Sequence, residues 1–155
     1  MFEPIRCRDT GIEFRGRQTS HADPLYNCVA WAFGRANVFW WPDPWDPGVW
    51  PIEHDFTDYG LGAFRRLFET WGWRASENAD YDSRLDKIAL FVDSELTPTH
   101  LARMLHDGEY SDIGAGAWSS KLAHGMDVAH ELDALCGPDR YGVVNCIYER
   151  AREPR

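Results

Sequence analysis

The chain has 155 residues, 44% of them hydrophobic and 26% charged, which fits one globular domain over 1–155 and excludes a disordered chain. The formal net charge of −9 disfavours nucleic acid as a partner, because an acidic surface repels phosphates. No apolar stretch reaches the roughly 20 residues that a membrane span needs, and we expect no contact with a membrane.

The first segments of the chain predict two helices joined by a loop. Asp23 or Asn27 can cap a helix that ends near Gly34, and Pro24 suits its first position. A loop rich in Trp and Pro follows over 39–51. From about 58 to 71 the apolar residues recur at helical spacing, which predicts an amphipathic helix closed by Gly72.

The second half of the chain is dominated by short apolar runs. We expect strands at 88–92, 99–105, 118–122 and 141–148, with a helix at 126–135 before Gly137-Pro138. Helices followed by strands predict an α+β domain in which a mostly antiparallel sheet carries helices on one side.

Cys28 and His100 are the residues with the clearest chemical potential. If the helix begins at Asn27 or Cys28, the thiol lies at a helix N-terminus, where free N–H groups favour a thiolate that would be alkylated fast near neutral pH. If the helix begins at Pro24, the thiol is an ordinary core group. His100 follows Pro98-Thr99 at the start of a predicted strand, from which an imidazole can act as a general base.

The segment around Cys28 resembles the Cys-bearing helix of papain-like cysteine hydrolases. Residues 25–148 also resemble a small bacterial family similar to cell-wall amidases and endopeptidases. The matching segments are Tyr26-Asn27-Cys28-Val29-Ala30-Trp31-Ala32, the Trp-Trp-Pro at 40–42, Lys87-Ile88-Ala89-Leu90, Thr99-His100-Leu101-Ala102-Arg103 and Trp118-Ser119-Ser120-Lys121-Leu122. The resemblance implies a papain-like fold, a Cys28 nucleophile and a His100 base.

The third catalytic group is open between two residues. In papain-like enzymes a polar side chain on the strand after the histidine orients the imidazole, and Ser120 holds that place if residues 109–116 are an insertion in the turn. Asp127 would stabilise an imidazolium better, but it also suits the cap of the helix expected after it. The glutamine that papain-like enzymes carry before the cysteine is missing, so an oxyanion would rest on the Cys28 N–H, with Asn27 or Tyr26 as further donors.

The Trp-rich loop has two interpretations. Trp40, Trp41, Trp45 and Trp50 alternate with Asp43, Asp46 and prolines, as in a platform that stacks on sugars, or they anchor a long loop on the core. If the protein is an enzyme, this loop, with Trp40 and Trp41, is the expected wall of the substrate groove beside Asn27.

The resulting hypothesis is a cysteine-dependent hydrolase of an amide or peptide bond that uses a thioester and no metal or cofactor. Deamidase and acyltransferase chemistry remain open. The N-terminus lacks the apolar region of a signal peptide, so we expect synthesis in the cytoplasm and, for a bacterial effector toxin, export by a route without a cleavable signal. The alternatives are a glycan- or peptide-binding module, and an acidic interaction protein; a toxin would have a cognate inhibitor or immunity protein as partner.

Overall fold

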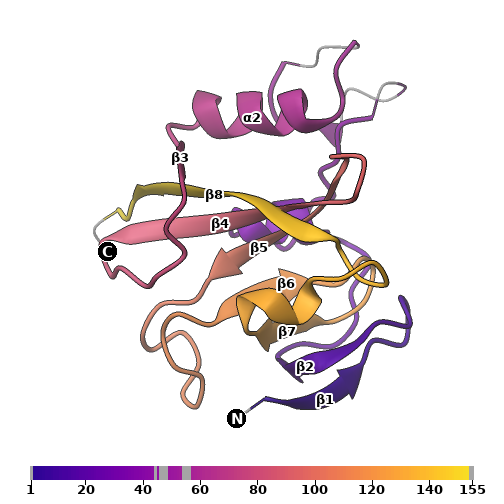
Figure 1. The fold of residues 1–155 in the computed structure, drawn as a ribbon, viewed down its shortest axis with the longest axis vertical. Coiled ribbons are helices and arrows are strands. Elements are labelled where there is room, and N and C mark those ends of the chain that lie inside the picture. Colours follow the sequence, from indigo (N-terminus) through magenta and orange to yellow (C-terminus); the bar gives the residue numbers. More distant parts are fainter. Residues whose placement is uncertain (1, 44, 46–48, 54–56, 154–155) are drawn as a thin grey trace.

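The computed structural model describes residues 2–43, 45, 49–53 and 57–153, and its dominant feature is one twisted sheet (Figure 1). Eight strands lie in the order β1-β2-β7-β6-β5-β4-β8-β3, and every neighbouring pair is antiparallel. The strands are β1 (Glu3–Arg6), β2 (Glu13–Gln18), β3 (Arg74–Ser76), β4 (Leu85–Val92), β5 (Pro98–Met104), β6 (Trp118–Lys121), β7 (Asp127–His130) and β8 (Val143–Ala151).

Helices are a minor part of the described chain. They are α1 (Cys28–Ala32), α2 (Leu61–Thr70) and a 3₁₀ helix, η2 (Leu132–Leu135). The predicted α+β papain-like fold is therefore wrong: this is a mostly β fold, and α2 is the single helix of seven or more residues in the described part. None of the described helices has the length and apolar character to cross a bilayer.

Elements with a strong periodic pattern agree with the sequence predictions. The predicted helix over 58–71 is α2, whose buried face carries Phe64, Leu67 and Phe68. The four predicted strands correspond to β4, β5, β6 and β8. Part of the Trp-rich loop, residues 44 and 46–48, lies outside the described residues.

The predicted helix over 126–135 is wrong. Its first part is β7, which pairs with β6, and only Leu132–Leu135 turn as η2. All four residues of β7 are buried, and the backbone ladder with β6 and β2 decides the conformation there. Asp127 consequently lies in a strand and caps no helix.

The sheet buries side chains on both faces. One cluster joins α1 and α2 to Ile88, Leu90 and Leu101. The other lies on the opposite face and contains Phe91 and Ala102, which alternate with the residues of the first cluster along β4 and β5.

The ladder between β5 and β6 is short. It pairs Arg103 with Ser119 and Met104 with Trp118 and stops there, so the earlier residues of β5, including His100 and Leu101, lie beyond it. The candidate site lies in the gap between β5 and β6, the part of the two strands where this ladder has ended.

Candidate active site

Cys28 is the first residue of α1. Asn27 is the N-cap in an extended conformation, and its Oδ1 accepts a hydrogen bond from the Ala30 amide at 3.2 Å. Of the two helix starts that the sequence left open, the structure has the one that puts the thiol at the helix N-terminus. The helix has only five residues, so the effect of its dipole is small.

Asn27 also anchors the Trp-rich loop. Its Nδ2 donates to the Trp40 carbonyl at 2.5 Å, and its Oδ1 accepts from the Trp40 amide at 3.1 Å. Both polar groups of the Asn27 side chain are thus used in the fold, which leaves the backbone N–H groups at the helix start as the donors closest to Cys28 in the chain.

His100 and Ser120 are in direct contact although 20 residues separate them. His100 Nε2 lies 2.8 Å from Ser120 Oγ, and both side chains are almost fully buried. Ser120 Oγ lies 2.7 Å from His130 Nε2, and His130 Nδ1 lies 2.6 Å from the Glu131 carbonyl oxygen. The side chains therefore form one chain of hydrogen bonds across the gap between β5 and β6.

This chain fixes the proton positions in the neutral state. A carbonyl only accepts, so His130 Nδ1 carries the proton and His130 Nε2 must accept from the Ser120 hydroxyl. The only hydrogen of the Ser120 hydroxyl is used in that bond, so Ser120 Oγ accepts from His100 Nε2–H. The remaining nitrogen of His100, Nδ1, has no hydrogen-bond partner among the described residues and is the basic one.

Tyr141 covers the His100 ring. The two rings stack at 4.1 Å with an interplanar angle of 10°. Thr99 Oγ1 donates to the Tyr141 carbonyl at 2.5 Å, which holds the tyrosine beside the strand that carries His100. Gly142 follows at φ 87°, and a Cβ there would meet the Val92 carbonyl oxygen, so glycine permits this close approach.

Cys28 reaches the same part of β5 from the other face of the sheet. The thiol packs in the cluster that contains Leu101 and hydrogen-bonds with the Leu101 backbone, one residue after His100. The His100 ring packs against Phe91 of the opposite cluster. No hydrogen bond joins the described thiol and imidazole, so the structure brings His100 and Ser120 together and places Cys28 on the opposite face of β5.

Burial decides the protonation of these groups. It raises the pKa of the Cys28 thiol to about 11, although backbone hydrogen bonds from Leu101, Val29 and Cys28 favour the thiolate. Burial also lowers the pKa of His100 well below its usual value and that of His130 to about 4. At neutral pH the site therefore holds a thiol and two neutral imidazoles. The helix start favours a thiolate, but burial of Cys28 outweighs that effect.

Asp127, the second candidate for the third group, belongs to a separate polar cluster. The Tyr26 hydroxyl donates to Asp127 Oδ2 at 2.8 Å. The partner of His100 is Ser120 and not Asp127. The buried ammonium of Lys121 lies 4.5 Å from the Tyr26 ring centroid and donates to the carbonyls of Asp23 and Gly125. This cluster ties the segment before Cys28 to the β6–β7 connection.

The tryptophans predicted to line a groove are largely packed. Trp40 contacts the Trp71 ring at 5.6 Å, Trp41 contacts Phe64 at 5.5 Å, and Trp50 is buried against the same Phe64. Trp45 is 91% exposed. The indoles at 40, 41 and 50 thus anchor the loop on α2, as the second of the two interpretations expects.

His130 is the site residue that the sequence reasoning missed. It was read as a helical residue, whereas β7 and β6 form a hairpin. The signal was available in Gly125, a turn residue between two short apolar runs. Among the described residues no three His, Cys, Asp or Glu side chains gather as metal ligands do.

Comparison with protein families gives one match. A family model described as "Domain of unknown function (DUF7689)" matches residues 17–149, a range that includes Cys28, His100, Ser120 and His130. The searches of curated proteins and of solved structures found no match.

Proposed function

We propose a function for this chain, which belongs to the DUF7689 family of domains of unknown function: it is a cysteine-dependent hydrolase that cleaves an amide or peptide bond. Cys28 is the nucleophile, His100 is the general base and Ser120 orients the imidazole. This assignment does not rely on a papain-like fold, which the mostly β architecture excludes.

The hydrogen-bond chain from His100 to Glu131 is the observation that carries the proposal. It makes Nδ1 the basic nitrogen of His100 and leaves that atom free to take a proton. A positioned base with a fixed tautomer is one of the two parts that thiol acyl transfer requires. The other part, the Cys28 thiol, hydrogen-bonds with the backbone of the next residue of the same strand, on the opposite face of the sheet.

The reaction has two stages. The Cys28 sulfur attacks the carbonyl carbon while the thiol proton moves to His100 Nδ1, and the oxyanion forms near the backbone N–H groups of Cys28 and Val29. The carbon–nitrogen bond then breaks, and His100 gives the proton to the departing amine. Water attacks the thioester with His100 taking one of its protons, which returns to the sulfur as the acid is released.

The resting site is closed and neutral, and substrate must bring the thiol and the base together. A ligand-free enzyme often holds its base beyond hydrogen-bond distance of the nucleophile, and the contact tightens in the complex. The loop that Asn27 anchors at Trp40 lies directly beside the N-terminus of α1. A peptide or amide substrate therefore approaches Cys28 along this loop.

The glycan-binding alternative has no comparable support. Trp50 is buried, and Trp40 and Trp41 are partly buried against Trp71 and Phe64, so Trp45 is the one indole in the described part of the loop that is largely exposed. Sugar platforms need ring faces that are open to solvent.

The proposal is tested by acylation of the folded protein with an activated ester, p-nitrophenyl acetate, read by intact and peptide mass spectrometry. We expect one acetyl group on Cys28, formed roughly 10²–10⁴-fold more slowly in His100→Gln. The matched control is Cys146→Ala, which removes a half-buried thiol elsewhere and should leave acylation of Cys28 unchanged. Acetylation of Cys146 but not Cys28, or equal rates with and without His100, would contradict the proposal.

A further inference from the structure

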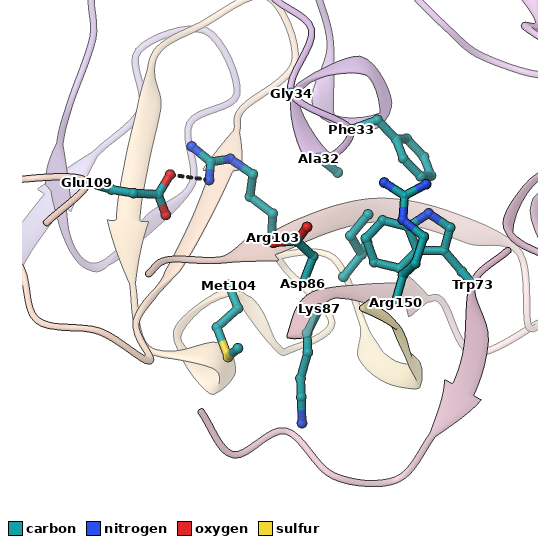
Figure 2. Close-up of a pocket in the computed structure, with 11 residues that line it drawn as sticks. Ala32, Phe33, Gly34, Trp73, Asp86, Lys87, Arg103, Met104, Glu109 and Arg150 are labelled. Carbon is teal, nitrogen blue, oxygen red and sulfur yellow. Dashed lines mark hydrogen bonds and ion pairs between the residues drawn. The ribbon is translucent and has the colours of Figure 1, made fainter. Parts of the chain in front are cut away.

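A pocket of about 260 Å³ opens at the C-terminal end of α1, away from the Cys28 end of that helix. Figure 2 shows its lining side chains, which come from α1, β4, β5, β8 and the segments after α1, after β5 and before β3. The apolar part of the wall includes Phe33 and Ile88, and the polar part includes Trp73, Arg103 and Arg150.

Three donors around this pocket have no acceptor. Among the described residues, Trp73 Nε1, Arg103 Nε and Arg150 Nε are buried and make no hydrogen bond. A buried donor without a partner is destabilising, so three of them around one cavity indicate an acceptor that occupies it. All three atoms belong to side chains that line the same pocket.

The lining side chains Lys87, Arg103 and Arg150 outnumber the carboxylates Asp86 and Glu109 by one charge, which favours an anion. Asp86, opposite Arg150 in the β4–β8 register, has His106 Nε2 as its partner at 2.9 Å. Arg103 forms an ion pair with Glu109 at 2.8 Å, which neutralises it. Arg150 has no carboxylate partner in the described part of the chain; its Nη1 donates to the Trp71 carbonyl at 3.1 Å. The Arg150 guanidinium lies 4.7 Å from the Trp73 ring centroid, and Figure 2 shows it beside the indole.

We propose that this pocket binds a small molecule through one carboxylate or phosphate group, whose oxygens accept from Trp73 Nε1–H and from the Arg150 guanidinium. Carboxylate and phosphate oxygens match both donors, and the charge assists each bond. The apolar part of the ligand packs on Phe33 and Ile88. The volume is below the roughly 300–1,000 Å³ of pockets for drug-sized ligands, so the ligand is small. This site is independent of the chemistry proposed for Cys28.

Titration of the ¹⁵N-labelled protein tests this site through the indole N–H resonance of Trp73, assigned with Trp73→Phe. The probes are sodium benzoate, sodium succinate and inorganic phosphate, and sodium chloride at matched ionic strength is the control. We expect a saturable shift with at least one probe, and the arm that responds tells whether the group is a carboxylate or a phosphate. Trp73 shifts no larger than those in chloride, with all three probes, would overturn the proposal.

Two arginine variants locate the binding. Arg150→Gln should weaken the affinity for the responding probe by about 10-fold or more, because a charged hydrogen bond of roughly 1.5–3 kcal/mol is lost. Arg6→Gln makes the same charge change on β1, at the opposite edge of the sheet, and should leave the affinity unchanged. An equal loss in both variants would show a nonspecific charge effect and would also overturn the proposal. The wild-type titration decides the question even if Arg150→Gln does not fold.

Discussion

Ser119 and Ser120 are consecutive buried residues of β6 whose hydroxyls serve opposite faces of the sheet. Ser119 Oγ accepts from Trp31 Nε1 at 3.0 Å on the α1 face. Ser120 Oγ bonds both His100 and His130 on the other face. The two positions have the same burial and the same change on truncation, so each is the control for the other.

Truncation of Ser120 should therefore impair catalysis, and truncation of Ser119 should not. Each serine-to-alanine change leaves a buried donor without an acceptor and should lower the free energy of unfolding by about 1–3 kcal/mol in urea titrations. In Ser120→Ala the His100 ring loses its orienting partner, and acylation of Cys28 should slow by at least ~10-fold. In Ser119→Ala the acylation rate should stay near wild type. Equal rates in the two variants would remove Ser120 from the site.

His130 should make stability depend on pH. Its pKa is lowered by burial to about 4 in the folded protein, against about 6.5 in an unfolded chain. The unfolded state then binds more protons below pH 6.5, so the stabilisation is complete above that pH and is lost as pH falls toward 4. The loss amounts to about 3 kcal/mol for this one group.

The measurement is the free energy of unfolding from urea titrations between pH 7 and 4.5. His130→Gln should be less stable at pH 7 but show a shallower fall over this interval. His21→Gln, a change at an exposed histidine, should keep the wild-type slope. A wild-type slope in His130→Gln would mean that this imidazole is not held neutral by burial.

Cys28 should be a slow thiol in the free protein, contrary to the fast alkylation that its place at a helix N-terminus predicts from the sequence. With a pKa raised to about 11 by burial, its thiolate fraction at pH 7 is roughly 300-fold smaller than for an ordinary cysteine of pKa ~8.5. Labelling with iodoacetamide, followed on the Cys28 peptide by mass spectrometry, should be at least that much slower in the folded protein than in urea. The rate should still rise with pH beyond 9. If Cys28 is labelled at pH 7 as fast in the folded protein as in the unfolded chain, its thiol is not buried as described.

Asn27 should be needed for the helix start and for the loop together. Asn27→Ala removes the cap of α1 and both bonds to Trp40, and we expect a loss of about 1–2 kcal/mol in thermal or urea unfolding. Asn27→Asp keeps the acceptor for Ala30 but replaces the donor to the Trp40 carbonyl. It should retain the cap while the loop loosens, visible as faster proteolysis in the Trp-rich segment. Equal losses of stability in the two variants would mean that the cap on Ala30 adds nothing to the bonds with Trp40.

The sequence predicted the elements in which a buried face imposes a period. The spacing of Phe64, Leu67 and Phe68 is helical, and Ile88–Val92 is a continuous apolar run typical of a strand covered on both faces. By contrast β2 buries only Phe14 and Gly16, a pattern too sparse to read. The spacing in 126–135 suits a helix, and only the pairing of β7 with two neighbours decides for a strand.

The candidate site divides in the same way. His100 and Ser120 could be placed on successive strands, because both strands were visible as patterns. His130 could not be placed there, because the pattern over 126–135 predicts a helix and not the strand β7. The pocket near Arg150 could not be predicted at all: Trp73 and Arg150 are 77 positions apart in the chain, and they meet only because β3 pairs with β8.

The order of the strands has a consequence for the behaviour of the protein at high concentration. The sheet ends in β1 and β3, which are only four and three residues long. Pro4 stands within β1 and cannot donate a backbone hydrogen bond, and the charged Arg74 opens β3. Short edge strands that carry a proline or a charge are poor templates for pairing with another chain. The sheet is therefore protected against aggregation through its two edge strands.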